Sequence, residues 1–120
     1  MKLREILMRP SEVTADEAFV QNIESLYNAS LSDEVKKIIS LSQDVTFYED
    51  KEIMRSLSNF EILNASDILQ VDFIDKSLLP IFDIGDNDFI VFDLSENCWY
   101  LFNIVDEVKF KKAMSFSIYL

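Results

Sequence analysis

PIFDIGDNDFIVFDL (residues 80–94) sets four aspartates within a run that otherwise has the composition of buried core. The β-branched and aromatic residues on both sides of its middle favour two strands. Between them, GDN (residues 85–87) consists of types that tolerate the unusual backbone angles of a tight turn. Asp83 and Asp88 flank this turn and can accept hydrogen bonds from its amides. The stretch therefore predicts a β-hairpin.

This hairpin belongs to a longer β region. LLPIFDI (residues 78–84), DFIVFDL (residues 88–94) and CWYLFNIV (residues 98–105) are separated by turn clusters, which predicts an antiparallel meander of three strands. Both faces of the last two segments are more apolar than a half-solvated sheet usually shows. We therefore expect helices to cover one face, and the chain ends or a partner to shield the other.

The first part of the chain predicts helices. Apolar spacing indicates an opening helical turn that ends at Pro10, a helix over residues 15–28 and a helix over residues 33–41. Thr14 and Glu17 form a possible capping box for the second helix, and Ser32 can cap the third. The expected buried residues are Phe19, Ile23, Leu26 and Tyr27 in the second helix, and Val35, Ile38 and Ile39 in the third.

The middle and the end of the chain complete the fold prediction. VTFYED (residues 45–50) and EIMRSL (residues 52–57) favour two short strands, and Ser58 with Glu61 has capping-box spacing before a helix over residues 59–69. KAMSFSIYL (residues 112–120) predicts a last helix that Ser115 caps and that packs back on the sheet. We expect an α+β fold, with N-terminal helices packed on a mainly antiparallel twisted sheet, in one domain over residues 1–120.

Acidic residues dominate the charge of the chain, and they are unevenly distributed. The net charge is −11, and residues 56–108 carry eleven acids against one base, Lys76. Direct binding to nucleic acid is disfavoured, because that affinity depends on cations that neutralise phosphates. A basic protein partner would instead be attracted. The alternative is that the charge serves solubility alone.

Cysteine content and apolar runs bear on the cellular compartment. Cys98 is the single cysteine, so no internal disulfide can form, which suits a reducing cytoplasm. We expect no secretory leader, because MKLREILMRP (residues 1–10) lacks a long apolar run, and no membrane span. The predicted location is the cytoplasm.

The sequence does not match the residue patterns of common metal, catalytic or phosphate-binding sites. Counted from Asp83, acids fall at relative positions 1, 4 and 6, glycine at 3 and Leu94 at 12, which does not match a calcium loop. Without histidine, zinc sites and Ser–His or Cys–His nucleophiles are not expected. Gly85 is the only glycine, so no phosphate-binding loop is present. We expect no enzyme, metal or cofactor, with a carboxylate-dependent hydrolase as the catalytic alternative.

Two segments together resemble a known family. LSDEVKKIISL (residues 31–41) matches a capped helix that precedes a β segment, and LLPIFDIGDNDFIVFDLSENCWYLF (residues 78–102) matches a hairpin followed by a strand with an aromatic pair. The chain is similar in these segments to the SUKH superfamily, which groups bacterial toxin-immunity proteins with fungal cell-wall-synthesis regulators. The family commonly opens the helix with proline, where this chain has Ser32.

The resemblance implies an SUKH-like fold and a binding role. Bacterial members of the family are inferred to neutralise a cognate polymorphic or contact-dependent toxin in the cytoplasm. A nuclease is one expected toxin, because an acidic inhibitor can occupy a basic cleft. A non-enzymatic intracellular scaffold or regulatory adaptor is the alternative role, and the expected oligomeric state is a monomer or a weak dimer.

The predicted partner-binding surface consists mainly of acids. Turn chemistry is the alternative role for the aspartates of this surface, and core packing is the alternative for its one aromatic residue. The predicted partner-binding residues are Asp72, Asp75, Asp83, Asp86, Asp88, Asp93, Glu96 and Trp99.

Overall fold

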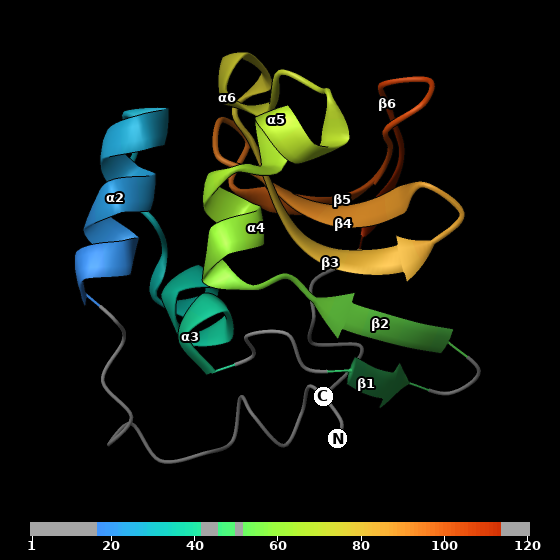
Figure 1. Cartoon of the computed structure of the whole chain (residues 1–120), viewed down its shortest axis with the longest axis horizontal. Helices are drawn as coiled ribbons and strands as arrows, with labels where there is room; N and C mark the ends of the chain where they lie inside the picture. The colour runs from blue at the N-terminus through green and yellow to red at the C-terminus, as the bar shows by residue number, and fades with distance from the viewer. Residues whose placement is uncertain (1–16, 42–45, 50–51, 114–120) are drawn as a thin grey trace.

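The computed structural model describes residues 17–41, 46–49 and 52–113 (Figure 1). The helices are α2 (Glu17–Tyr27), α3 (Asp33–Leu41), α4 (Asn59–Leu63), α5 (Ala65–Leu69) and α6 (Phe73–Lys76), and the strands are β1 (Thr46–Glu49), β2 (Glu52–Ser56), β3 (Leu78–Gly85), β4 (Asp88–Asp93), β5 (Cys98–Asn103) and β6 (Val108–Ala113). These strands form one antiparallel sheet in the order β1-β2-β3-β4-β5-β6. The predicted α+β class is confirmed.

The two N-terminal helices that the structure describes follow the predicted ranges. In α2, Phe19, Ile23 and Tyr27 are buried as expected, but Leu26 is exposed and Val20 is buried instead. The prediction for Leu26 was wrong because the buried stripe runs through positions 19, 20, 23 and 27, and residue 26 lies on its margin.

Helix α3 begins as the sequence predicts. The Val35 amide donates to Ser32 Oγ over 3.3 Å, so Ser32 satisfies one of the unpaired amides at the helix start. The predicted stripe of Val35, Ile38 and Ile39 is buried. The predicted opening turn before Pro10, the Thr14 cap and the Ser115 cap lie outside the described residues.

The segment between β2 and β3 contains three short helices where the sequence predicted one longer helix. The capping box is confirmed, since the Glu61 amide donates to Ser58 Oγ over 3.2 Å and the Ser58 amide donates to Glu61 Oε1 over 3.0 Å. The predicted helix over residues 59–69 is interrupted at Asn64, whose side-chain amide donates to the carbonyl oxygen of Phe60. Asn competes with the helical backbone for hydrogen bonds, which explains the break at this position.

The hairpin of β3 and β4 is confirmed at the turn that the sequence marked. Asp86 and Asn87 have φ values of 55° and 65°, as a two-residue turn between antiparallel strands requires. Gly85 adopts φ of 91°, and its amide donates to Asp83 Oδ1 over 2.9 Å. Asp83 thus fixes the turn, as predicted.

Strand β6 extends the predicted meander at one edge, and the β1–β2 hairpin extends it at the other. The sequence prediction assigned no element to residues 106–111, whereas Val108–Ala113 form β6. The predicted helix after Ser115 lies outside the described residues. The β5–β6 turn repeats the β4–β5 turn, because Asn103 Oδ1 accepts from two turn amides just as Asp93 Oδ1 does. Both turns are therefore formed by the same hydrogen bonds, from the amides two and three residues later to a side-chain Oδ1.

The centre of the sheet is buried on both faces. The Phe73 ring of α6 lies against Phe102 of β5 with a centroid distance of 5.7 Å, so the helices between β2 and β3 cover the face that Phe102 shares with Phe89 (Figure 1). The expectation of a helix-covered face is confirmed. On the opposite face, Ile90 and Phe92 are also buried within this single chain.

A buried carboxylate fastens the edge strand β6 to the rest of the sheet. Asp93, only 3% exposed, accepts from the amides of Ser95 and Glu96 and from Lys109 Nζ at 2.8 Å. Burial by itself would raise the pKa of Asp93, but the hydrogen bonds from Lys109 and the two amides outweigh it and lower the pKa below its usual value. The ionised form of Asp93 therefore stabilises the folded state.

We predict that Asp93→Asn lowers the free energy of unfolding by about 1–3 kcal/mol. The asparagine is uncharged and has only one oxygen, so the charge-assisted hydrogen bond from Lys109 is lost or an NH₂ group faces one of the donors. Urea unfolding at neutral pH measures this change. Asp86→Asn removes the same charge from an exposed turn position that already has positive φ. Its effect should stay within about 0.5 kcal/mol, and equal losses in the two variants would contradict the assigned role of Asp93.

Candidate interaction surface

The structure separates most of the predicted partner-binding residues into two groups at opposite ends of β4. Asp83, Asp86 and Asp88 lie at the β3–β4 turn, where β4 begins, and the second group lies where β4 ends. A strand of six residues spans roughly 20 Å. The second group consists of Asp72, Asp75, Asp93 and Glu96. The predicted acids therefore do not form one continuous surface.

The first group gains acids from another turn. Asp86 is exposed, and Asp88 Oδ1 accepts from Asn103 Nδ2 over 2.8 Å. The Ile104 amide donates to the Asn87 carbonyl oxygen over 3.0 Å, which brings the β5–β6 turn with its exposed Asp106 and Glu107 to the same end. This end of the sheet is strongly negative.

The second group is partly used by the fold. Asp72 caps α6 by accepting from the Asp75 amide over 3.1 Å, and both side chains are exposed. Glu96 accepts a hydrogen bond from the Tyr100 hydroxyl, which together with desolvation raises the pKa of Tyr100 above its usual value. The Lys109 ammonium lies 3.7 Å from Glu96 Oε2, so its positive charge offsets part of the negative charge here.

Two of the eight predicted residues are not presented at the surface. Asp93 is enclosed by the contacts described above, and Trp99 is 3% exposed. The Trp99 ring packs edge-on against Phe92, with a centroid distance of 4.9 Å and an interplanar angle of 73°. Core packing, the alternative role for Trp99, is what the structure shows.

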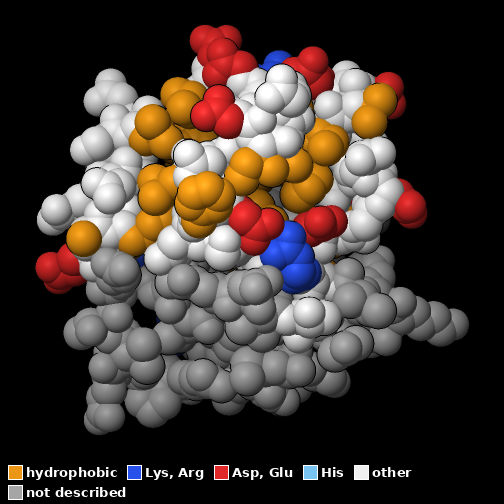
Figure 2. Space-filling model, viewed as in Figure 1, with side chains coloured by type: hydrophobic (Ala, Val, Ile, Leu, Met, Phe, Trp, Pro, Cys, Tyr) orange, Lys and Arg blue, Asp and Glu red, His pale blue; other side chains and the backbone are white. Residues whose placement is uncertain are grey.

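A feature that the sequence reading missed is an apolar surface on α4 and α5. Phe60 is 68% exposed and Ile68 is 48% exposed, and they lie eight residues apart with Asn64 between them. We call Phe60, Asn64, Ile68 and Leu69 the α4–α5 face. Figure 2 shows hydrophobic side chains gathered over these helices, with acidic side chains around them. The sequence predicted that Ile62, Ala65 and Leu69 line one side of this segment; Ile62 and Ala65 are buried and Leu69 is partly buried. A signal was present, since positions 60 and 68 fall off that predicted stripe.

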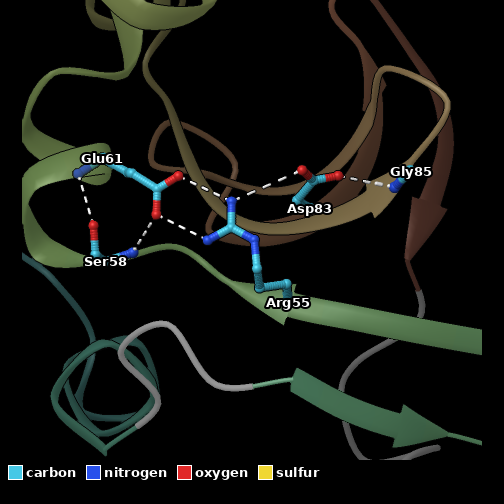
Figure 3. A network of polar contacts seen from close by, with 5 residues as sticks. All are labelled: Arg55, Ser58, Glu61, Asp83 and Gly85. Carbon is cyan, nitrogen blue, oxygen red and sulfur yellow. Dashed lines mark hydrogen bonds and ion pairs between the residues drawn. The ribbon is translucent and has the colours of Figure 1, made fainter.

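A polar network borders this face (Figure 3). Arg55 of β2 contacts both carboxylate oxygens of Glu61, with Nη1–Oε1 and Nη2–Oε2 distances of 2.9 Å. Arg55 Nη2 also lies 3.9 Å from Asp83 Oδ2 of β3. The hydrogen bond from Arg55 is the largest of several effects that lower the pKa of Glu61 to about 2. Asp83 thus obtains a cation from Arg55, its cross-strand partner on the neighbouring strand β2.

Between the network and the face lies a small hollow of about 50 Å³. Its lining combines apolar and charged side chains: Arg55, Leu57, Glu61, Ile68, Leu69, Asp83 and Phe89. Small-molecule sites usually measure roughly 300–1,000 Å³. The hollow is therefore too small for a substrate, but it suits the tip of one side chain from a binding partner.

A second concavity among the described residues is a shallow polar surface near the end of α2. It has a volume of about 510 Å³ and is lined by Gln21, Glu24, Ser25, Asn28, Ala29 and Ser30. Glu24, its one ionisable residue, accepts from the Leu31 amide over 2.9 Å. Its residues thus offer neither a nucleophile–base pair nor an apolar anchor site.

The described part of the chain has neither a cluster of metal-ligating side chains nor a helix that could span a membrane. Residues 17–41, 46–49 and 52–113 contain no group of three or more histidine, cysteine or acidic side chains placed to hold a metal ion. None of the helices in this part of the chain has the length and apolar character to cross a membrane.

We predict that Glu61→Gln removes part of the acid sensitivity of the fold. Because the folded pKa of about 2 lies below the usual 4.5, the Glu61 carboxylate stabilises the fold above about pH 4.5, and this contribution disappears as the pH falls towards 2. Glutamine can still accept from the Ser58 amide. Near pH 7 the free energy of unfolding of the wild type should exceed that of the variant by about 1 kcal/mol. This value allows for solvent screening of a partly exposed ion pair.

Urea unfolding at a series of pH values between about 2 and 7 measures this difference. Asp67→Asn on α5 is the control, because Asp67 is exposed and has no ion pair among the described residues. The same pH dependence in both variants would show that the Arg55 contact does not cause it.

No protein-family model matches the sequence, and no curated protein matches it either. The resemblance of residues 31–41 and 78–102 to the SUKH superfamily therefore stays a prediction. The α+β architecture, the α4–α5 face and its polar border rest on the structure itself.

Proposed function

We propose that this chain is a non-enzymatic immunity protein that binds and neutralises a toxin domain with a basic surface in the cytoplasm. The proposal combines the resemblance to the SUKH superfamily with the surface of the molecule. A scaffold or adaptor of the same fold would use the same kind of surface, and the assay below separates the two roles.

The observation that supports this proposal is the α4–α5 face. Monomeric proteins expose single apolar residues commonly, but grouped ones mark interaction sites. Phe60 is an aromatic residue held on a short helix whose start is fixed by the Ser58–Glu61 capping box. Exposed aromatic residues on a rigid support are frequent anchors of protein interfaces.

The charge around the face selects the kind of partner. Glu61 and Asp83 border it, and Asp67 is exposed on the same helix pair. With a net charge of −11, this surface attracts a basic protein and repels a second copy of itself. A toxin that acts on nucleic acid has such a basic surface, because it must bind phosphates.

We predict that Phe60→Ser weakens binding of the toxin domain by about 10- to 100-fold, which is the usual effect of truncating an interface anchor. Co-expression of this chain with the toxin domain encoded beside it, scored by growth and by pull-down, provides the assay. Phe110→Ser on the edge strand β6 is the matched control, since Phe110 is 50% exposed and β6 lies three strands from β3. Protection that survives Phe60→Ser as well as Phe110→Ser would contradict the assigned face.

A second variant tests the contribution of the predicted acids. The combined change of Asp83, Asp86 and Asp88 to Asn should slow association and flatten its dependence on salt, because it removes charges that attract a basic partner. The control removes equal charge from exposed positions on α2 and α3 by changing Glu17, Asp33 and Glu34 to the corresponding amides. Stopped-flow or surface-binding kinetics at several salt concentrations measure the rates.

The outcomes distinguish the roles. Binding that protects cells supports the immunity role, and binding without protection points to the adaptor. Equal association rates for the two triple variants would show that the β3–β4 turn is not near the contact.

A further inference from the structure

The hollow beside the α4–α5 face has an apolar floor and a charged mouth. Its apolar lining consists of the buried Leu57 and Phe89 together with Ile68 and Leu69. Its charged lining consists of Arg55, Glu61 and Asp83, whose side chains converge in Figure 3. A side chain that enters this space meets hydrocarbon along its length and charge at its end.

The charges at the mouth do not balance. Among the described residues that line the hollow, two carboxylates face one guanidinium, and Glu61 already accepts two hydrogen bonds from Arg55 and one from the Ser58 amide. Asp83 is less engaged. Its Oδ1 accepts from the Gly85 amide, whereas its Oδ2 lies 3.9 Å from Arg55 Nη2, beyond hydrogen-bond distance. Asp83 thus has capacity for another cation.

From this geometry, and on the basis of the proposed function, we infer that the hollow receives a basic side chain of the partner protein. The aliphatic stem of a lysine or arginine would lie along Ile68 and Leu69, and its cationic head would bind Asp83 Oδ2. Basic side chains commonly bury their stems in this way while the charged end stays near water. A carboxylate would be repelled by Glu61 and Asp83, and an uncharged apolar side chain would leave Asp83 Oδ2 without a second cation.

The first test measures affinity for the toxin domain. Asp83→Asn retains an oxygen that can accept from the Gly85 amide but loses the charge, so affinity should fall by about 10-fold or more. Asp86→Asn removes the same charge three residues away, at an exposed position outside the hollow lining, and should change affinity by about 2-fold or less. Equal losses in the two variants would overturn the inference.

The second test is independent of the toxin. n-Butylammonium reproduces the stem and head of lysine, and at millimolar concentration it should shift the amide NMR signals of residues 68, 69, 83 and 85 in the wild type. Asp83→Asn should abolish these shifts while Asp86→Asn retains them, and n-butanol, which lacks the charge, should give much smaller shifts. Shifts spread evenly over all exposed acids would overturn the inference.

The two tests separate the inference from the proposed function. If the toxin domain does not bind the wild type but butylammonium still occupies the hollow, the proposed function fails and the basic-ligand site stands. If the toxin domain binds and Asp83→Asn has no larger effect than Asp86→Asn, the function stands and the site fails. Self-association of the wild type that Phe60→Ser abolishes would overturn the choice of partner, since the occupant would then be a second copy.

Discussion

The paired contact between Arg55 and Glu61 determines where the short helices lie on the sheet. Arg55 belongs to β2, and Glu61 is the third residue of α4 and also closes its capping box. One carboxylate therefore completes the helix start and ties it to the strand before it. Because both oxygens of Glu61 are engaged, α4 can neither rotate nor shift without breaking charge-assisted bonds. Since Arg55 and Glu61 both line the hollow, this contact contributes to the shape of the hollow and to the position of α4 beside it.

The same constraint explains why apolar side chains remain exposed. A five-residue helix has little more than one turn, so it can bury only a narrow stripe, and α4 uses Ile62 for this purpose while α5 uses Ala65. With Ile62 facing the core and Glu61 bound to Arg55, Phe60 projects outwards from α4, and with Ala65 facing the core, Ile68 projects outwards from α5. Their exposure is a consequence of how the helix is anchored, and it leaves a rigid surface that a partner can bind without first ordering it.

Local interactions were predictable from the sequence, and long-range ones were not. The Ser58–Glu61 box and the turn after Asp83 involve residues within three positions of each other, so their spacing alone indicates the contact. Asp93 and Lys109 are sixteen residues apart, and the sequence therefore suggested an exposed acid where the structure has a buried carboxylate paired with a partly exposed lysine. The sequence prediction assigned no element to most of VKFKKA, which forms the edge strand β6, although lysine is common on edge strands. The α4–α5 face depends on the break at Asn64 and on the sheet beneath it, neither of which spacing can specify.

The order of the strands has a kinetic consequence. Each strand pairs only with strands adjacent to it in the chain, so most of the sheet can assemble by successive hairpins without bringing distant segments together. Low contact order of this kind favours fast folding, because little loop-closure entropy is lost before pairing begins. We expect the pairing of β2 with β3 to be the slowest step, because the segment between these two strands contains the three short helices and forms the longest loop to be closed. A protein of this topology could begin to fold while its C-terminal hairpins are still leaving the ribosome.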